Sequence, residues 1–597
     1  MPLKPRRLLA TSAAEDAWGT SEPLLFLGEW CKPYQRRHVW ARRDSKTARF
    51  HWDDGDKRRR DYAYLESLHR SLLTSLAECL NEFHRVDHSV RYWQIQLDPW
   101  LASYIGVVFD RWESLRLAFA EYGELELVSR AGAAATPPPY GHLSFIDQAL
   151  SDEWNRSLHE RIIRSEYSGQ CVIRQEPAAM AADQESGRSG PGRKRQSVLG
   201  RIAWATDGFL GRCFRDYDVV FLGATFSLPA LIRLNLALGQ APRLFLAEFA
   251  PRPVSASVGD AVRRAGLRLD VQTASRFEEF LAQSIVLDLP SSVVEHYPAL
   301  RDRARGLAIK TKAIVTGGRH WFDEFAKVWF AEQVSQGVKL VITEHGGALP
   351  DAKEWFDFEV DIADAKTTWF VPYHPTKHRR LPPARLVGGF ARLRSAVRPA
   401  SASRYCSVIL YECARWVHRV HLCPMASQWS VGFEMILAFH DALDAEVKEF
   451  FLVKPRPIDA GWNMRQRYSD ILGPAKVLTE PALDRVFDSS RVIVCTYPQT
   501  TFSEAMASGV PTVLMYPEHL WDVNPVAFPL LDSLRSAKIL FHEPLAAAAH
   551  INAIWGDPGR WWTSPDVIDA RRHFQEMAQD LDGHWLEKWT AFLKGVV

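Results

Sequence analysis

The sequence predicts an α/β protein with two lobes, each built on a parallel, doubly wound sheet, and with extra helices near the N-terminus. Short apolar runs alternate with segments of helical spacing in the second half of the chain, which is typical of strand–helix–strand units. The 597 residues include 47% hydrophobic and 24% charged side chains, as in ordinary globular proteins. The net charge of +2 gives no reason to expect nucleic-acid binding.

Residues 1–375 form the predicted N-terminal lobe, which we expect to bind an acceptor substrate. An apolar run at 24–27 is expected to be a buried strand that ends at Gly28. Leucines recur at three- and four-residue spacing from 61 to 84, which predicts an amphipathic helix. We expect the aromatic segment that follows to stop at Pro99, because proline lacks a backbone donor.

Two segments of unusual composition interrupt this pattern. Residues 182–196 are rich in glycine, serine and charge, which predicts a mobile surface loop. Residues 376–404 combine prolines with many basic side chains and show no period, which indicates a linker. Residues 405–597 then form the predicted C-terminal lobe, where we expect a nucleotide donor to bind.

The C-terminal lobe shows the clearest alternation of strands and helices. Strands are predicted at 408–411, 450–453, 492–495 and 512–516, with helices at 430–447 and 501–508. Gly509, followed by Pro511, marks the end of the second helix. Ligands of such sheets bind beyond the carboxyl ends of the strands, so polar residues at those ends are the candidate site.

The first polar cluster follows a predicted strand at 339–342 and contains His345, Gly346 and Gly347. The glycines allow a ligand to approach the backbone closely. His345 is a candidate general base, or a hydrogen-bond donor to a phosphate. A tight turn with a satisfied histidine is the alternative interpretation.

The second cluster follows the strand at 450–453 and alternates two cations with two prolines. Because proline fixes φ, the loop is stiff and aims Lys454 and Arg456 at little entropic cost. Both side chains are suited to pairing with a phosphate. A rigid surface turn is the alternative.

The third cluster joins the strand at 492–495 to the next helix. Thr500 and Thr501 stand at the start of that helix, where free N–H groups attract anions. Glu504 either accepts the hydroxyl groups of a ribose or closes a capping box on Thr501. Together, the three clusters predict a site for a phosphorylated ligand, and a nucleotide fits best.

Two acidic groups near the N-terminus are further candidates for a catalytic base. Glu29 follows the strand at 24–27, and Asp53 belongs to an acidic pair with Asp54. For that pair, a solvated turn or a helix-start charge is the alternative. The sequence lacks the Walker A, GxGxxG, HExxH and GxSxG motifs, and nothing in it calls for a metal or a cofactor.

The compartment is predicted from cysteine usage and from apolar runs. Eight cysteines contain no CxxC pair, which fits a reducing cytosol. The basic N-terminus is not followed by the apolar run of a secretory signal, and no stretch is long enough for a transmembrane helix. We therefore expect a cytoplasmic protein.

Several blocks resemble a family of bacterial transferases of surface-polysaccharide and O-antigen biosynthesis, the LIC12162-type family. These blocks lie at 8–34, 51–54, 91–101, 345–347 with 356–370, and 500–513. The C-terminal half also resembles GT-B glycosyltransferases, in which two Rossmann-like lobes face each other across a cleft. The run from Lys454 to Pro457 is similar to the Lys/His-Pro motif of capsule and sialic-acid-type transferases, with Arg456 where that motif often has histidine. Thr500 and Thr501 resemble their serine–threonine motif.

The resemblance implies a metal-independent glycosyltransferase with a nucleotide-sugar donor and a glycan or lipid-linked glycan acceptor. A CMP-activated acidic sugar is the favoured donor, with UDP and GDP sugars as alternatives. A lipid-linked acceptor would bring the enzyme to the inner face of the inner membrane. The rival functions are a sugar-nucleotide epimerase, a polyol-phosphate transferase, and a non-catalytic glycan-binding assembly protein whose 22 tryptophans would stack on sugars.

Overall fold

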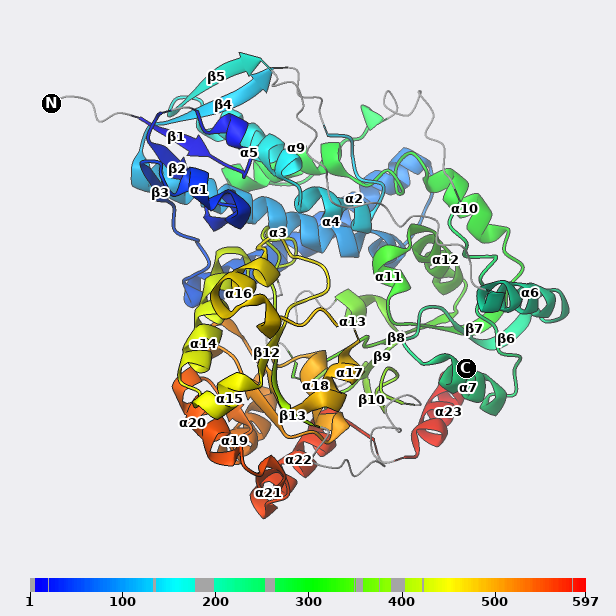
Figure 1. The fold of residues 1–597 in the computed structure, drawn as a ribbon. Helices are drawn as coiled ribbons and strands as arrows, with labels where there is room; N and C mark the ends of the chain where they lie inside the picture. Colours follow the sequence, from blue (N-terminus) through cyan, green and yellow to red (C-terminus); the bar gives the residue numbers. More distant parts are fainter. Residues whose placement is uncertain are drawn as a thin grey trace.

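Three parallel sheets of five strands each organise the chain (Figure 1). The computed structural model describes residues 6–19, 21–131, 136–177, 198–252, 264–347, 349–350, 358–374, 376–387, 403–420, 424–480, 482–581 and 583–597. The loop predicted at 182–196 and residues 388–402 of the predicted linker lie outside the described residues.

The first sheet has the strand order β3-β2-β1-β4-β5, and every neighbouring pair is parallel. Its strands are β1 (Arg7–Ala10), β2 (Leu24–Phe26), β3 (Ser45–Thr47), β4 (Leu125–Ala131) and β5 (Cys171–Pro177). The accompanying helices are α1 (Arg37–Trp40), α2 (Gly55–His84), α3 (Val90–Tyr122), α4 (His142–Ala149) and α5 (Asp152–Glu166). Asp54 caps α2 by accepting hydrogen bonds from the N–H groups of Asp56 and Lys57, so the acidic pair does start a helix.

The helix α3 corrects one expectation from the sequence. Pro99 lies inside a continuous helix of 33 residues and does not end it. The helix is buried on most of its circumference, and it packs against α2, α5 and α12. This packing outweighs the cost of about 3 kcal/mol that proline imposes on a helix interior.

The second sheet has the strand order β10-β9-β8-β7-β6 and is parallel throughout. Its strands are β6 (Asp216–Phe221), β7 (Lys310–Thr316), β8 (Lys339–Thr343), β9 (Ala365–Thr368) and β10 (His378–Arg380). Its helices are α6 (Val198–Cys213), α7 (Leu228–Ala237), α10 (Tyr297–Arg305), α11 (Arg319–Phe322), α12 (Glu324–Ser335) and α13 (Phe358–Ile362), whereas α9 (Arg276–Asp288) packs on α3 of the first unit. The C-terminal helix α23 (Trp585–Val596) returns to this unit and packs on α7 (Figure 1).

The third sheet has the strand order β12-β11-β13-β14-β15 and is also parallel. Its strands are β11 (Tyr405–Ile409), β12 (Phe451–Lys454), β13 (Ser490–Cys495), β14 (Thr512–Met515) and β15 (Leu540–Phe541). Its helices are α14 (Trp429–Asp441), α15 (Ala445–Glu449), α16 (Met464–Leu472), α17 (Leu483–Ser489), α18 (Thr500–Ser508), α19 (Phe528–Ser536), α20 (Pro544–Ile554), α21 (Pro558–Trp562) and α22 (Pro565–Ala578). The strand order reverses between β11 and β13, and ligands of open sheets bind at such a switch point.

The predicted α/β class with parallel sheets is confirmed. The N-terminal region carries a sheet of its own in addition to the predicted extra helices, so the described residues form three sheets. Strand β10 extends the second sheet into the segment that the sequence assigns to the linker.

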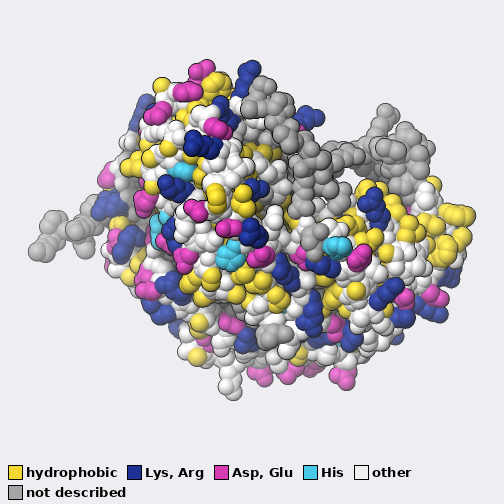
Figure 2. All heavy atoms as spheres, turned by 90° about the horizontal axis from the view of Figure 1, so that it is seen from below, with side chains coloured by type: hydrophobic (Ala, Val, Ile, Leu, Met, Phe, Trp, Pro, Cys, Tyr) yellow, Lys and Arg dark blue, Asp and Glu magenta, His cyan; other side chains and the backbone are white. Residues whose placement is uncertain are grey.

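Two features of the exterior and the interior bear on function. The face in Figure 2 mixes basic and acidic side chains, in keeping with the net charge of +2. Among the described residues, no helix is long and apolar enough to cross a membrane.

The largest fully buried side chains include Trp18, Trp30, Trp52, Trp93, Trp100, Trp329, Trp416 and Trp589. These tryptophans build the core and are not available to stack on a sugar.

Candidate functional site

The turn that follows β8 lies against the first turn of α18. A Cβ at Gly346 would collide with the side chain of Thr500, so only glycine permits this approach. Ser503 Oγ donates a hydrogen bond to the Gly347 carbonyl oxygen at 2.8 Å. The tertiary structure therefore brings together the first and third polar clusters of the sequence.

The N-terminus of α18 has no side-chain cap, because Gln499 makes no hydrogen bond from its side chain to the helix. Thr501 instead hydrogen-bonds the Tyr497 hydroxyl. Glu504 accepts a hydrogen bond from Arg385 Nε at 2.8 Å and does not close a capping box on Thr501. The backbone N–H groups of such a helix start favour a bound anion.

Burial raises the pKa of Glu504, although Arg385 acts in the opposite direction. The Glu504 side chain is buried, whereas half of the Arg385 side chain is exposed. The arginine is therefore the partner that can move. A ligand hydroxyl that replaced it would find an acceptor already held in place by the helix.

His345 stands among several charged groups between the second and third sheets. The ring is exposed to solvent, yet the protein around it makes protonation costly and lowers its pKa. Glu359 opposes this shift, while Arg419 and Arg385 add to it. The imidazole is therefore neutral at neutral pH and is able to accept a proton.

Arg419 is a half-buried cation that the sequence analysis did not single out. Its guanidinium lies over the rings of Trp321 and Phe322, at 5.2 and 5.7 Å from their centroids. Burial and the charge of Arg456 lower its pKa to about 10. Its Nε is buried and has no hydrogen-bond partner. A buried donor without a partner is costly, so this group is suited to an anionic ligand.

The second polar cluster folds against the carboxyl end of β11. Lys454 is the last residue of β12 and is buried, and its pKa is lowered by burial and by Arg465. Arg456 donates from its backbone N–H to Glu412 Oε1 at 2.7 Å. Its Nη1 also donates to the Glu412 carbonyl oxygen at 3.3 Å.

Glu412 is a second residue that the sequence analysis missed. It follows β11, and burial raises its pKa to about 7. The hydrogen bond from the Arg456 backbone opposes this shift, whereas Asp459 adds to it. An acidic residue directly after the predicted strand at 408–411 was the available signal. Perturbed pKa values of this kind are common at functional sites.

A glycine pair at 317–318, after β7, forms a further turn that the sequence analysis passed over. Beyond it, His320 Nε2 lies 2.7 Å from Glu359 Oε1, and Lys366 Nζ lies 3.1 Å from Glu359 Oε2. Burial alone would raise the pKa of Glu359, but Lys366 and His320 hold it well below its usual value. Glu359 also acts on His345 electrostatically and opposes the lowering of its pKa.

The two N-terminal candidates lie where the first unit meets the third. Lys32 Nζ lies 2.6 Å from Glu29 Oε1. Asp53 Oδ1 accepts a hydrogen bond from Gln428 Nε2 at 3.3 Å, and burial raises the pKa of Asp53. Among the described residues, no hydrogen bond or ion pair joins either carboxylate to His345.

The site is rich in cations for its size. Within the described parts of the chain, no group of three or more His, Cys, Asp or Glu side chains is placed to hold a metal ion. The available charge comes instead from Lys454, Arg456 and Arg419, together with the N–H groups of α18. Such an arrangement can bind a phosphate and stabilise it as a leaving group.

Solved structures similar to this chain are glycosyltransferases. SnogD from Streptomyces nogalater shares 14% identity at a TM-score of 0.31, over 64% of this chain and 99% of that one. MurG from Acinetobacter baumannii shares 12% identity at a TM-score of 0.32, over 63% and 99%. The spinosyn rhamnosyltransferase SpnG shares 13% identity at a TM-score of 0.32, over 64% and 100%.

The family assignment comes from the sequence. A search of curated protein sequences found no match to the chain. The sequence model of the LIC12162 family of transferases, in contrast, matches residues 7–593, so this chain belongs to that family.

Proposed function

We propose that this transferase is a glycosyltransferase that moves a sugar from a nucleotide donor to a bacterial surface-glycan acceptor. The observation that carries the proposal is the pair Arg419 and Arg456 beyond the carboxyl ends of parallel strands. The charge of Arg456 disfavours the charge of Arg419, whose buried Nε has no partner. A phosphate bound between them would relieve the repulsion and accept the hydrogen bond.

The donor phosphates would sit against Lys454, Arg456 and the start of α18, where Thr500 and Thr501 add hydroxyl groups. The turn at Gly346 and Gly347 packs directly on Thr500, so its backbone borders this helix start. As the bond between sugar and phosphate breaks, negative charge develops on the leaving nucleotide. Cations already in place stabilise that charge without reorganisation.

Glu504 would accept the ribose hydroxyls after Arg385 turns away. A CMP donor is favoured because the segment from Lys454 to Pro457 is similar to the motif of transferases that use CMP-activated sugars. UDP and GDP donors are the alternatives.

The acceptor hydroxyl needs a base as its oxygen attacks the anomeric carbon. Two groups would accept the proton of that hydroxyl. They are Glu412, with a pKa of about 7, and His345, which is neutral at neutral pH. Glu29 and Asp53 stay as candidates from the sequence. In an inverting reaction the proton passes to one of these groups while the nucleotide phosphate leaves.

The test measures nucleotide binding by thermal shift and calorimetry with CMP, UDP, GDP and CDP. We expect one nucleotide to raise the melting temperature, and Arg456→Ala to weaken its binding by tenfold or more, since hydrogen bonds to charged groups contribute about 1.5–3 kcal/mol. Arg572→Ala is the matched control, because Arg572 is an exposed arginine on α22. Binding of none of the four nucleotides would contradict the proposal.

Two further expectations follow from the same roles. Because arginine and lysine supply the charge that faces the leaving phosphate, activity should survive EDTA. A lipid-linked acceptor would place this cytoplasmic enzyme at the inner face of the inner membrane, so vesicles that carry the acceptor should sediment the protein. Product formed from the nucleotide sugar alone would favour an epimerase instead.

A further inference from the structure

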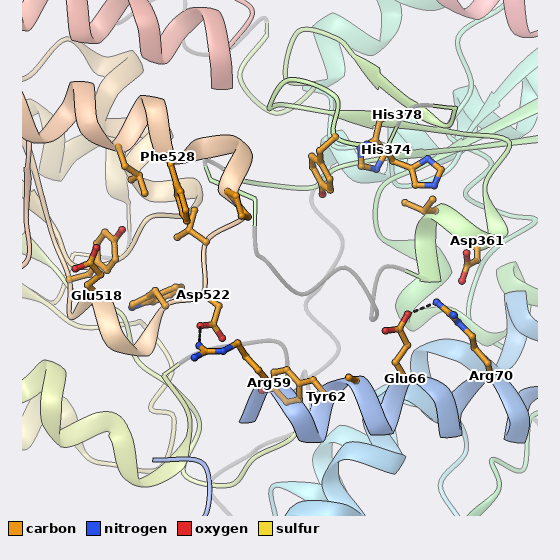
Figure 3. Close-up of a pocket in the computed structure, with 18 residues that line it drawn as sticks. Arg59, Tyr62, Glu66, Arg70, Asp361, His374, His378, Glu518, Asp522 and Phe528 are labelled. Carbon is orange, nitrogen blue, oxygen red and sulfur yellow. Dashed lines mark hydrogen bonds and ion pairs between the residues drawn. The ribbon is translucent and has the colours of Figure 1, made fainter. Parts of the chain in front are cut away.

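A cavity of about 910 Å³ opens between three parts of the chain (Figure 3). One wall is the exposed face of α2, and the opposite wall is the segment from β14 to α19. The third wall comes from α13 and the loop between β9 and β10. The cavity lies within the usual size range of small-molecule sites, about 300–1,000 Å³. The proposed phosphate site uses none of its lining residues.

Carboxylates outnumber guanidinium groups among the lining residues, although the buried Arg58, which is not one of them, also pairs with Asp522, its Nη2 lying 3.0 Å from Oδ2. The carboxylates and guanidinium groups of the lining are Glu66, Asp361, Glu518, Asp522, Arg59 and Arg70. Both arginines are already neutralised in the structure, because Arg70 pairs with Glu66 and Arg59 Nη1 lies 3.4 Å from Asp522 Oδ1 (Figure 3). His378 also lines the cavity, and burial with the charge of Lys366 lowers its pKa to about 3, so the ring is neutral at neutral pH.

Two of the carboxylates are largely exposed to solvent. Glu518 Oε1 lies 3.6 Å from both Arg535 Nη2 and His542 Nε2, and most of its side chain is exposed. Asp361 is exposed, and Lys377 Nζ binds its backbone carbonyl oxygen at 3.0 Å. Both carboxylates are therefore accessible to a ligand that donates hydrogen bonds.

Aromatic rings supply the apolar part of the lining. Half of the Phe528 side chain is exposed, and Phe528 and Tyr373 both line the cavity. Trp521 connects the cavity to the crevice between β11 and β13, since its ring centroid lies 5.1 Å from that of Tyr411. The Tyr411 backbone N–H in turn donates a hydrogen bond to Thr496 Oγ1 at 2.7 Å. The cavity thus adjoins the site proposed for the donor.

We propose that this cavity binds the acceptor saccharide, and that it takes uncharged, hydroxyl-rich saccharides in preference to acidic ones. That the bound saccharide is the acceptor rests on the proposed function. That the cavity binds a saccharide rests on the side chains that line it. Carboxylates accept hydrogen bonds from sugar hydroxyls, and exposed rings cover the apolar faces of sugar rings. The exposed carboxylates of Asp361 and Glu518 repel a phosphate or a uronic acid.

This chemistry separates the two substrates by charge. The crevice at Arg419 and Arg456 attracts the phosphates of the donor, whereas the cavity at Asp361 and Glu518 repels them. A nucleotide sugar is thereby kept from occupying the acceptor position. The two sites would meet at Trp521, which lines the cavity and contacts Tyr411.

The experiment titrates the full-length protein with methyl glycosides of glucose, galactose, mannose, rhamnose and N-acetylglucosamine. Binding is measured by saturation-transfer NMR. The uronic acids of glucose, galactose and mannose are titrated in parallel. We expect at least one neutral glycoside to bind at least tenfold more tightly than any of the acids. Phe528→Ala should weaken that binding severalfold, and Asp361→Lys should narrow or reverse the preference for neutral sugars.

The controls are Leu545→Ala, an exposed apolar residue on α20, and Asp484→Lys, an exposed acid on α17. Neither lines the cavity, so both should bind as the wild type does. Acids that bind as tightly as neutral glycosides, no glycoside binding, or equal effects of Phe528→Ala and Leu545→Ala would each overturn the proposal.

Nucleotide binding measured on the same samples separates this inference from the proposed function. Glycoside binding without nucleotide binding would leave the cavity as a saccharide site and remove the donor assignment. Nucleotide binding without glycoside binding would remove the cavity proposal alone.

Discussion

Glu412 shows how burial prepares a single carboxyl group for proton transfer. The group is buried beyond the end of β11, and its pKa is raised to about 7. The Arg456 backbone N–H holds one of its oxygens at 2.7 Å, so its orientation is fixed. A base with a pKa near the working pH combines a large deprotonated fraction with sufficient basicity.

Replacing Glu412 by glutamine should therefore remove a step in the pH profile. As a base, the carboxylate acts only when deprotonated, so kcat/KM of the wild type should rise as the pH passes through about 7. Glu412→Gln keeps an oxygen for Arg456 and loses the proton acceptor. We expect kcat to fall by about 10²–10⁴ and the rise near pH 7 to disappear. If Glu412→Gln kept the wild-type kcat and the rise near pH 7, His345 would be the base instead.

The raised pKa of Glu412 also makes the stability of the wild type depend on pH, in the opposite direction to its activity. Measuring this dependence in the wild type and in Glu412→Gln checks the pKa. Below pH 4.5 the folded and unfolded states both hold the proton, and between 4.5 and about 7 only the folded state does. Wild-type stability should therefore fall across this window by on the order of 3 kcal/mol. Glu412→Gln should escape that loss, so denaturant melts at pH 5 and pH 8 should differ less for the variant.

At the scale of elements, the contact between the β8 turn and α18 joins the second sheet to the third. Gly346→Ala would place a methyl group inside the van der Waals radius of Thr500. Because overpacking costs about 1–3 kcal/mol, the turn and the helix should separate. We expect nucleotide affinity, measured by calorimetry, to fall by about tenfold.

Two further variants interpret that result. Gly346→Ala combined with Thr500→Ala removes the collision and should restore the spacing between turn and helix. Gly208→Ala is the control, because a Cβ at that helical position in α6 meets nothing within 4 Å. If Gly346→Ala alone bound the nucleotide like the wild type, the close approach would have no part in donor binding.

At the scale of the whole molecule, Arg467 ties the first unit to the third. Its guanidinium lies 4.2 Å from the ring centroids of both Tyr34 and Trp429. Burial lowers its pKa to about 10. Asp470 reinforces the junction by accepting a hydrogen bond from the Tyr34 hydroxyl at 2.8 Å.

Arg467→Ala should weaken this junction by about 1–3 kcal/mol, the sum expected for two cation–π contacts. Calorimetry should then resolve an earlier unfolding transition for the first unit. Arg467→Lys should not rescue it, because an ammonium group lacks two flat faces. Arg571→Ala, which removes an arginine 4.5 Å from Trp562 within the third unit, should lower stability without splitting the transition. A single unsplit transition in Arg467→Ala would place the coupling of the units elsewhere.

The local pattern of the sequence determined the fold class and the motifs at the strand ends. Alternating apolar runs and helical periods specify parallel α/β units, because both signals depend on neighbours within a few residues. For the same reason, the sequence alone identifies the turns at His345, Lys454 and Thr500, although it does not show how they are arranged in space.

Only the tertiary structure decided which of those residues meet and what their environment does to them. Pro99 stays helical because distant helices bury α3, and the pKa of Glu412 rises because segments far along the chain remove water from it. Arg419 has no motif, and its importance comes from the rings and the second arginine that folding brings to it. Burial and electrostatics act through space, so a local pattern cannot contain them.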